Sequence, residues 1–284
     1  MKLKNAKSIP EQIDLLRNRG MIIDNESQAY SFLESNHYYR LNIYFHKFMV
    51  KPNCYDNKIN FTNIISIYEN DSLLRNNILF LLERIEVETR THVSHYLALT
   101  YGPDAFYNAK IFKSMSKYKQ IYNNFNFQIS RNKKDPVILH HNNKYGGKFP
   151  IWVIIEYLSF NTISKLYNNL LEKDKKVISK RIHNVNDHLF GQWLHVLSIQ
   201  RNICAHYGYL FRRIYAIRPI IAKSFNWNKN NDDELFSQFL VMKQLTDRHI
   251  WNEFVLKIVE FEKMRPCFNL ADYGFPNDWK SYLL

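Results

Sequence analysis

The sequence has 284 residues, of which 46% are hydrophobic and 15% aromatic, which is ample for a buried core and excludes an intrinsically disordered chain. Lys and Arg number 39 against 26 Asp and Glu, and this net charge of +13 indicates a polyanionic partner, with nucleic acid first and an anionic membrane surface second. The three cysteines are far apart and form no C-x-x-C pair, which indicates neither a disulfide framework nor a zinc ribbon.

Residues 1–60 are expected to form an N-terminal helical region. Ser8 is a suitable N-cap for the first helix, and Gly20 is placed to end it. The expected elements after this helix are a short helix over residues 26–34, an aromatic block over 37–48 and a loop over 51–60.

The remaining residues, 61–284, are predicted to form one helical domain. A long helix over residues 62–101 has apolar residues at helical spacing, and Gly102 with Pro103 stops it. Residues 110–127 are expected to be helical as well. The polar stretch 131–147 contains two Gly and two adjacent His, and we interpret it as a mobile loop, a flexible insertion near residues 128–148.

Helices dominate the rest of the chain too. The expected elements are helices over residues 149–171, 173–183, 188–207 and 233–263, and an irregular aromatic tail over 265–284. Gly208 is expected to end the third of these helices, and Asp232 or Asp233 to cap the fourth. Because alternating strand patterns are scarce, the predicted fold class is all-α.

No targeting or membrane segment is expected. The stretch from Met1 to Pro10 is polar and basic, without the apolar region of a signal peptide. The most apolar stretches, Ile78–Leu82 and Ile151–Phe160, are far shorter than the roughly 18 residues that a spanning helix needs. We therefore expect a soluble cytoplasmic protein without a membrane partner.

The segment Gln200–Arg213 contains the residues with the best-defined chemistry. It reads Q-R-N-I-C-A-H-Y-G-Y-L-F-R-R and lies at the end of an amphipathic helix. Asn202 and His206 are four residues apart and share one helix face, whereas Arg201 lies about 140° round the axis from His206. The three side chains can act at one point if a second surface faces this helix.

Such a trio suits RNA cleavage in which the 2′-OH attacks its own phosphate, a reaction that needs neither a protein nucleophile nor a metal. We assign proton transfer to His206, stabilisation of the phosphate charge to Arg201 and orientation of these groups to Asn202. The alternative is structural, since Arg and His near a helix C-terminus often complement its dipole and bind the last carbonyls.

Six sequence blocks resemble a known family, and they occur in the family's order. They are R-N-R-G-M-I-I-D at 17–24, Y-Y-R-L at 38–41, L-E-R-I-E-V-E-T-R at 82–90, F-P-I-W-V-I-I-E-Y-L-S-F at 149–160, R-N-x-x-A-H at 201–206 and Y-G-F-P-N-D-W at 273–279. On these residues the chain resembles the Abi-like (AbiD/AbiF) abortive-infection proteins of the HEPN superfamily, whose signature is R-x4–6-H. Asn42 and Ile43 depart from the family pattern, which has small residues with a Gly there.

The resemblance implies a HEPN-type helical bundle and a homodimer that brings two motif copies to one composite site. It implies an antiphage effector, an endoribonuclease that cleaves RNA without a metal or cofactor and acts as a toxin. Its alternative is a HEPN module that binds a small RNA or a protein partner and does not cut. A regulatory small RNA and an antitoxin are further expected partners, whereas a membrane-surface toxin is disfavoured because no strongly amphipathic basic helix stands apart from the core pattern.

Basic residues outside the motif are candidate RNA ligands. Arg212, Arg213 and Arg218 follow the motif among aromatic residues, and together they can grip phosphates and stack unpaired bases. Lys175 and Lys176 lie in a basic run on a short helix that can guide RNA by long-range attraction. The alternative for both groups is that the aromatic residues are core and the basic residues are solvated.

The other chemically active residues are expected to be structural. Cys204 is expected to be buried and inert, and Glu86, Glu88 and Arg90 are expected to form a network beneath the motif helix. No metal site is expected from the two histidine pairs, which lack further ligands at suitable spacing. These pairs are His92 with His95 and His140 with His141.

Overall fold

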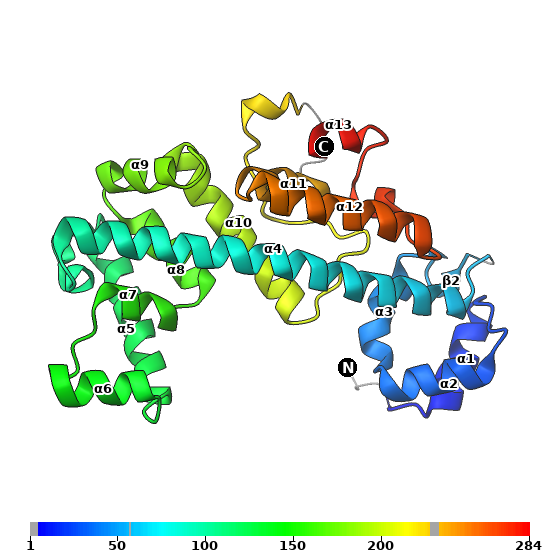
Figure 1. Cartoon of the computed structure of the whole chain (residues 1–284). Coiled ribbons are helices and arrows are strands. Elements are labelled where there is room, and N and C mark those ends of the chain that lie inside the picture. Colours follow the sequence, from blue (N-terminus) through cyan, green and yellow to red (C-terminus); the bar gives the residue numbers. More distant parts are fainter. Residues whose placement is uncertain (1–4, 57, 228–232) are drawn as a thin grey trace.

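The computed structural model of the chain describes residues 5–56, 58–227 and 233–284. Helices make up 69% of the chain, and the β structure within the described residues is limited to one short hairpin and two isolated bridges. The predicted all-α fold is therefore confirmed. Figure 1 shows an elongated molecule, in which one long helix connects an N-terminal unit, a lobe at the opposite end and a C-terminal group of helices.

The N-terminal unit consists of three short helices and the hairpin. The side chain of Ser8 accepts the backbone N–H of Glu11, and the Glu11 carboxylate accepts the backbone N–H of Ser8, which completes a capping box. Gly20 follows the first helix with a φ of +93°, a region that favours glycine. The elements are α1 (Ile9–Asn18), α2 (Glu26–Ser35), α3 (Tyr38–His46), β1 (Met49–Lys51) and β2 (Cys54–Tyr55).

Helix α4 (Phe61–Tyr101) is the spine of the molecule. Asn60 caps its start by accepting the backbone N–H of Thr62, and Gly102, with a φ of +90°, ends it. Its 41 residues correspond to a length of roughly 60 Å. Different units pack on different stretches and faces of α4, which is why its sequence shows no single continuous apolar stripe.

The lobe surrounds the C-terminal end of α4 (Figure 1). Within it α5 packs against α8, and α7 packs against α4. The lobe consists of η1 (Ala105–Tyr107), η2 (Ala109–Ile111), α5 (Met115–Arg131), α6 (Pro136–Tyr145), α7 (Ile151–Ile154), η3 (Ile155–Tyr157), α8 (Phe160–Asn169) and α9 (Glu172–Arg181).

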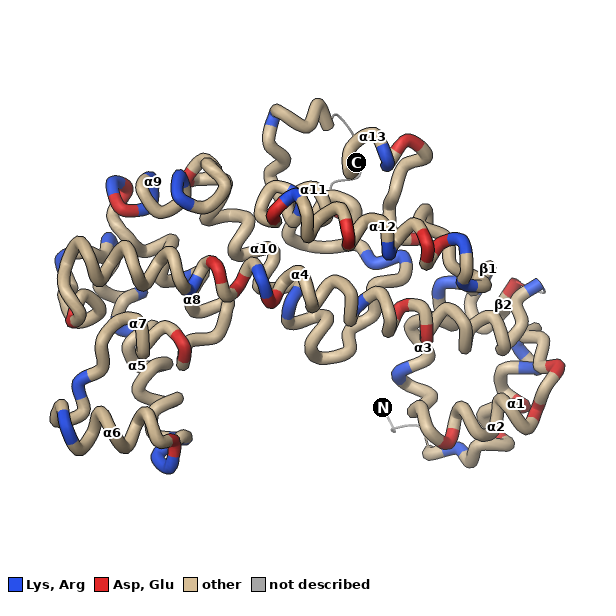
Figure 2. The backbone as a smooth tube through the Cα atoms, viewed as in Figure 1, with Lys and Arg blue, Asp and Glu red and all other residues tan. Residues whose placement is uncertain are grey.

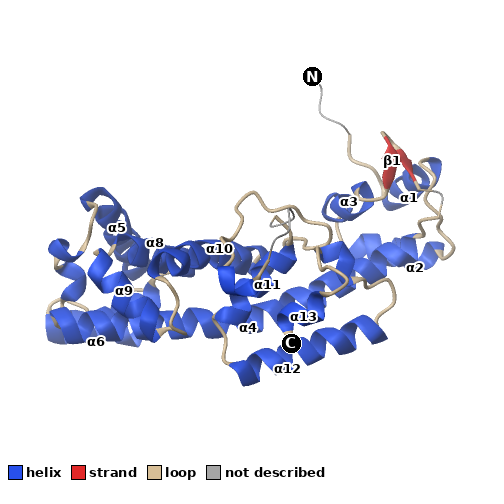
Figure 3. Cartoon of the chain, turned by 90° about the horizontal axis from the view of Figure 1, so that it is seen from above, coloured by secondary structure: helices blue, strands red, loops and turns tan. Residues whose placement is uncertain are grey.

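Helix α10 (Asp187–Ala205) packs against α8, α9 and α4 in the middle of the molecule. The indole Nε1 of Trp193 donates to the carbonyl of Ile220 at 2.7 Å, which ties the segment after α10 back along the helix. Helix α12, which belongs to the C-terminal group, lies beside α4 (Figure 3). This group consists of η4 (Lys223–Phe225), α11 (Leu235–Gln244), α12 (Arg248–Met264), η5 (Leu270–Tyr273) and α13 (Trp279–Leu283).

The prediction of a mobile loop over residues 131–147 is wrong, because most of this stretch is helix α6. Asp135 accepts the backbone N–H of Val137 at 2.8 Å, Pro136 occupies the first turn, and Gly146 ends the helix in the left-handed conformation. The polar composition concealed a helix start and stop that these three residues encode.

Two predicted helices are interrupted. The helix expected over 149–171 divides at Ser159, whose hydroxyl accepts the backbone N–H of Thr162 and starts α8. The helix expected over 233–263 divides between α11 and α12, where Asp247 takes the N-cap position of α12.

Three smaller expectations also change. Glu234 occupies the N-cap position of α11 in place of Asp233, and Asp232 lies outside the described residues. The loop expected over 51–60 contains strand β2, and the tail expected to be irregular forms η5 and α13.

Candidate active site at the end of helix α10

Helix α10 is largely buried and reaches the surface at its C-terminal end. Asn202 and His206 are exposed there, and 38% of the Arg201 side chain is accessible. Nη1 of Arg201 donates to Oδ1 of Asn202 at 3.4 Å, and the backbone N–H of His206 donates to the Asn202 carbonyl at 2.9 Å. The structure therefore places the three predicted catalytic residues together at one helix end.

A buried carboxylate lies beneath Arg201. Oε2 of Glu86 on α4 is 3.5 Å from Nε of Arg201, while Oε1 of the same carboxylate pairs with Arg90. Arg90 also donates to the carbonyls of Ile155 and Leu158 in the lobe. Glu86 thus holds Arg201 from behind and connects it to the lobe, as the expected network requires.

A tight turn follows Ala205 and fixes the position of His206. Tyr207 adopts the left-handed conformation with a φ of +59°, and its N–H donates to the Cys204 carbonyl at 3.2 Å. The N–H of Gly208 donates to the Ile203 carbonyl at 2.7 Å. These two bonds form a Schellman motif, so Tyr207 takes the position that glycine usually occupies, and Gly208 follows it.

Asp71 of α4 anchors the segment that follows this turn. Its carboxylate accepts the backbone N–H groups of Leu210 and Phe211 at 2.9 Å, the Tyr44 hydroxyl at 2.7 Å and Nη1 of Arg75 at 2.8 Å. Burial and the neighbouring carboxylate raise the pKa of Tyr44 far above its ordinary range, so its hydroxyl remains a donor. The sequence analysis did not identify this anchor. Its indication in the sequence was the spacing of Asp71 and Arg75, two charged residues four apart inside an apolar helix.

Arg40 of α3 contacts the same turn. Its Nη2 donates to the Tyr207 carbonyl at 3.0 Å, and its guanidinium carbon lies 5.4 Å from the centre of the Tyr207 ring. The Tyr207 ring is itself 67% exposed. Arg40 of the Y-Y-R-L block therefore supports the end of the motif helix across 167 positions of sequence.

A cluster of cations lies beyond the turn. Nζ of Lys47 donates to the Arg212 carbonyl at 2.8 Å, and burial, followed by the charges of Arg212 and Arg213, lowers the pKa of Lys47. The Arg212 guanidinium pairs with Asp272 at 2.6 Å, and that of Arg213 lies 4.7 Å from the centre of the Tyr209 ring. Lys47 was missed in the sequence because it lies in a different unit.

The other predicted RNA-binding residues lie apart from this cluster. Arg218 pairs with Asp233 at 2.9 Å, and its carbonyl accepts a hydrogen bond from Gln192 near the start of α10. Lys175 is buried on α9 and lies 3.1 Å from Glu172, whereas Lys176 is exposed. Of these three residues, Lys176 alone is fully exposed on a helix surface.

Cys204 is buried inside the motif, as expected. Its thiol lies 3.3 Å from Nε2 of Gln200, and burial raises its pKa to about 12. A thiol with this pKa is protonated near neutral pH and is a weak nucleophile.

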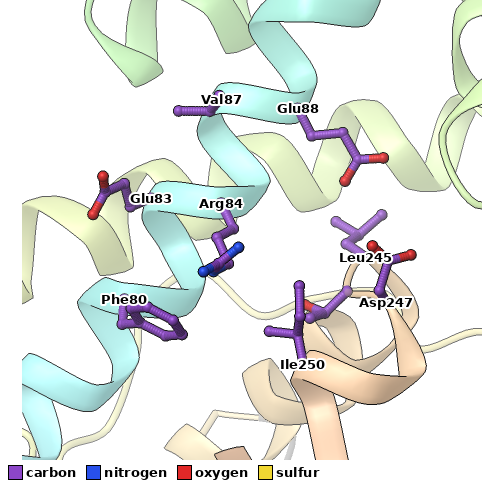
Figure 4. Close-up of a pocket in the computed structure, with 9 residues that line it drawn as sticks. Phe80, Glu83, Arg84, Val87, Glu88, Leu245, Asp247 and Ile250 are labelled. Carbon is purple, nitrogen blue, oxygen red and sulfur yellow. The ribbon is translucent and has the colours of Figure 1, made fainter.

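Glu88 does not belong to the network of Glu86. It faces the other side of α4, where it pairs with His183 at 3.4 Å and lies 3.7 Å from His92. Figure 4 shows Glu88 extending toward Asp247 at the wall of a pocket of about 430 Å³. Glu83 and Arg84 also line this pocket, so its lining holds three carboxylates against one guanidinium, a negative surplus that disfavours a phosphate.

The described residues contain neither a metal-binding cluster nor a membrane-spanning helix. No group of three or more His, Cys, Asp or Glu side chains among them is arranged to hold a metal ion. None of the helices in that part of the chain has the length and apolar content needed to cross a membrane.

The fold and the site define an all-α protein whose central helix presents an Arg-Asn-His group at its exposed end. Residues 31–212 match the Abi-like protein family. Because this match covers more than half of the chain, the protein belongs to the Abi-like family, and its setting is abortive infection, a form of phage defence. No curated protein and no solved structure matches the chain.

The matched region includes all of the candidate active site. It begins within α2, runs through α4 and α10 and ends at Arg212, directly after the turn that Asp71 anchors. Helices α11 to α13 lie outside it.

Proposed function

We propose that this Abi-like protein is a metal-independent endoribonuclease of the HEPN type, of the AbiD/AbiF subgroup, and that it acts in abortive infection as a toxin that cleaves RNA. The observation that supports this proposal is that Arg201, Asn202 and His206 all reach the surface at the C-terminal end of a largely buried helix. Packing of the core does not require an exposed His and a partly exposed Arg at this helix end. Proton transfer uses the His, and phosphate binding uses the Arg.

The proposed reaction is transesterification within the RNA. The 2′-oxygen forms a bond to the adjacent phosphorus as the bond from phosphorus to the 5′-oxygen breaks. A proton leaves the 2′-OH and another reaches the departing 5′-oxygen, and His206 serves as the acid or base for these transfers. The Arg201 guanidinium stabilises the phosphorane-like charge, and Asn202 orients it through Nη1. The products are a 2′,3′-cyclic phosphate and a 5′-hydroxyl.

The surroundings of Arg201 fit this role. Glu86 approaches the guanidinium at Nε, and Nη1 donates to Asn202 at 3.4 Å. Both contacts fix the orientation of the guanidinium, which is proposed to bind the phosphate through its terminal nitrogens. The cations Lys47, Arg212 and Arg213 lie beyond the adjacent turn and extend the positive surface along which RNA is bound.

A second copy of the chain completes the proposed site. Arg201 leans toward α4, while His206 lies beyond the end of the helix, so one copy leaves the two groups on different sides. Two α10 ends that face each other across a two-fold axis bring the Arg of one copy toward the His of the other. A small RNA or an antitoxin that restrains the enzyme is proposed to cover the same surface.

The experiment that tests the function is an RNA cleavage assay with purified protein in EDTA. Single-stranded RNA should yield products with a 2′,3′-cyclic phosphate, and a 2′-deoxy substitution at the cleaved nucleotide should block the reaction. His206→Ala should lower the rate about 10²- to 10⁴-fold. His188→Ala is the matched control, since this exposed histidine lies at the opposite end of the same helix.

The alternative, a HEPN module that binds without cutting, makes the opposite prediction in cells. Under the nuclease proposal, His206→Ala and Arg201→Ala proteins fold and lose toxicity. If folded His206→Ala protein is as toxic as the parent, cleavage is not the basis of toxicity, and binding takes its place.

A further inference from the structure

A second concave site lies in the lobe, on elements that the Arg201–His206 site does not use. It has a volume of about 610 Å³, within the range of small-molecule sites. It opens between the segment after α4, the end of α6 and the start of α7. Its lining is mainly aromatic, and the residues that matter here are Asp104, Tyr107, His141, Tyr145, Lys148 and Trp152.

Two aromatic residues of this pocket are about half-exposed. Trp152 is 51% exposed and Tyr145 is 49% exposed. The chain has five tryptophans, all within the described residues, and Trp152 is the most exposed. Trp193 and Trp251, by contrast, are buried, and their Nε1 groups donate to backbone carbonyls. Trp152 and Tyr145 therefore offer ring surface that the core does not need.

The walls of the pocket are fixed by interactions within the protein. The Tyr107 hydroxyl accepts the backbone N–H of Phe149 at 3.1 Å, and the N–H of Ile151 donates to the Pro103 carbonyl at 2.9 Å. The His141 ring stacks on Phe149 with 5.2 Å between ring centres. The site is thus formed before any ligand arrives, which lowers the entropy lost on binding.

One polar residue of the lining, His141, has its ring orientation fixed by a hydrogen bond. Nδ1 of His141 lies 2.8 Å from the carbonyl of Val137, to which it donates. In the neutral ring Nε2 then holds the lone pair and accepts a hydrogen bond. Asp104 lines the same pocket. Both groups can accept from the amino and imino groups of a nucleobase.

The charge of the surrounding segment favours a polyanion. Residues 104–153 contain nine Lys and Arg, all exposed, against two Asp, which is a surplus of seven positive charges in a chain whose total is +13. Lys148 lines the pocket, and Nζ of Lys144 lies 5.4 Å from the centre of the Tyr145 ring. Figure 2 shows Lys and Arg at the α6 end of the lobe. The carboxylate-rich pocket beside Glu88 has the opposite character.

We infer that this pocket binds an unpaired base of single-stranded RNA, which stacks on Trp152 and Tyr145 while Lys148 pairs with a neighbouring phosphate. Exposed aromatic rings inside a positively charged groove are the means by which proteins bind single-stranded nucleic acid. The inference rests on the proposed function in that it takes RNA as the ligand, and it adds a second contact for the substrate, away from the cleaved bond.

The test measures affinity and does not depend on cleavage. A short fluorescein-labelled RNA without self-complementarity is titrated with His206→Ala protein, and its anisotropy is followed. Trp152→Ala and Tyr145→Ala, each added to this protein, should weaken binding roughly 5- to 150-fold, the usual effect of removing one base-stacking ring. Because both side chains are half-exposed, these variants should keep the helical circular dichroism of the parent.

Two control variants separate stacking from general effects. Trp152→Phe retains a ring and should stay near the parent affinity. Tyr39→Ala removes a ring that is 77% exposed on α3, far from the lobe in sequence, and should leave the affinity unchanged. An RNA of the same length and charge but made of abasic riboses should bind parent and Trp152→Ala protein equally.

The outcomes distinguish this inference from the proposed function. The base-binding pocket is refuted if Trp152→Ala protein binds the RNA as tightly as the parent does. It is also refuted if Trp152→Ala lowers the affinity for the abasic RNA as much as the affinity for the normal RNA. Either result holds whatever the cleavage assay shows. If the wild-type protein cuts no RNA and the Trp152 dependence of binding persists, the nuclease proposal fails and the pocket stands.

Discussion

Arg201 and Glu86 lie 115 positions apart in the sequence, and Nε of the arginine is 3.5 Å from Oε2 of the carboxylate. The other oxygen of Glu86 pairs with Arg90, so one buried carboxylate serves two guanidinium groups. The site arginine is therefore supported by the same network that joins α4 to the lobe.

This network predicts a strong effect of Glu86→Gln. The amide keeps the shape but removes the charge, which leaves the largely buried Arg90 without its counter-ion. We expect a loss of about 1–3 kcal/mol in the free energy of unfolding, measured by urea denaturation. RNA cleavage should fall roughly tenfold or more while RNA affinity changes little, because Arg201 loses its support. Glu83→Gln, exposed one turn earlier, is the control and should change stability by less than about 0.5 kcal/mol.

The conformation of Tyr207 predicts an inversion of the usual ranking of glycine and alanine. A residue with a φ of +59° is disfavoured unless it is glycine. Tyr207→Gly should therefore be more stable than Tyr207→Ala by about 1 kcal/mol. At Leu256, exposed in the middle of α12, the order should be reversed by a similar amount, because glycine weakens a helix interior. Equal stabilities of the two Tyr207 variants would contradict the left-handed turn.

Helical periodicity predicted the spine helix and the motif helix closely. Residues 62–101 became α4, Phe61–Tyr101, because apolar spacing and the Gly102-Pro103 stop act locally. The break between α11 and α12 was missed, since Leu245 and Thr246 continue the apolar pattern and are buried at the break. The spacing of apolar residues indicates which positions are buried. A turn that is itself buried therefore cannot be told from a continuous helix by this spacing.

The sequence placed the three residues of the candidate site together and also predicted Glu86 and Arg90 beneath them, but it did not predict the rest of their support. Arg201, Asn202 and His206 lie within six residues of one helix, so sequence spacing brings them together. Asp71 and Arg40 reach the same turn only after α4 and α3 pack beside α10. No local pattern encodes those contacts, because they depend on how the units meet in space.

The cation cluster predicts a change in the salt dependence of RNA binding. Burial, followed by the charges of Arg212 and Arg213, lowers the pKa of Lys47, and an RNA phosphate in this cluster would relieve the repulsion among the three cations. Lys47→Gln should reduce the slope of log Kd against log salt concentration by about 0.7, the value for one phosphate contact on a single strand. The control Lys263→Gln, exposed on α12, should leave the slope unchanged. A flat salt dependence of the parent protein would argue against any phosphate contact.

The pair of His183 and Glu88 predicts a pH-dependent contribution to stability. The hydrogen bond to Glu88 raises the pKa of His183 above its ordinary value of 6.5, with Asp247 adding to the effect. The same bond lowers the pKa of Glu88 below 4.5. The histidine's contribution is full below pH 6.5 and is lost as the pH rises through its raised pKa. The carboxylate's contribution is present above pH 4.5 and is lost as the pH falls through its lowered pKa.

His183→Asn tests this window. Asparagine tolerates the φ of +52° found at this position but does not titrate. The parent should exceed the variant in stability by up to about 1 kcal/mol near pH 5.5, given a partly exposed pair, and by much less above about pH 8. Urea denaturation of both proteins across this range provides the measurement. A difference that stays constant with pH would show that the pair does not titrate as described.

The proposed composite site predicts where two copies touch. If the C-terminal ends of two α10 helices face each other across a two-fold axis, Asn202 of one copy lies near the same residue of the other. In a Cys267→Ser background, which removes the exposed native thiol, Asn202→Cys should form a disulfide-linked dimer under mild oxidation. Tyr39→Cys, exposed on α3, is the control and should remain a monomer on non-reducing gels. RNA should slow the cross-link, because substrate occupies the same interface. If light scattering finds only monomers that still cleave RNA at the full rate, a single copy of Arg201 and His206 suffices, and the facing-helix arrangement is wrong.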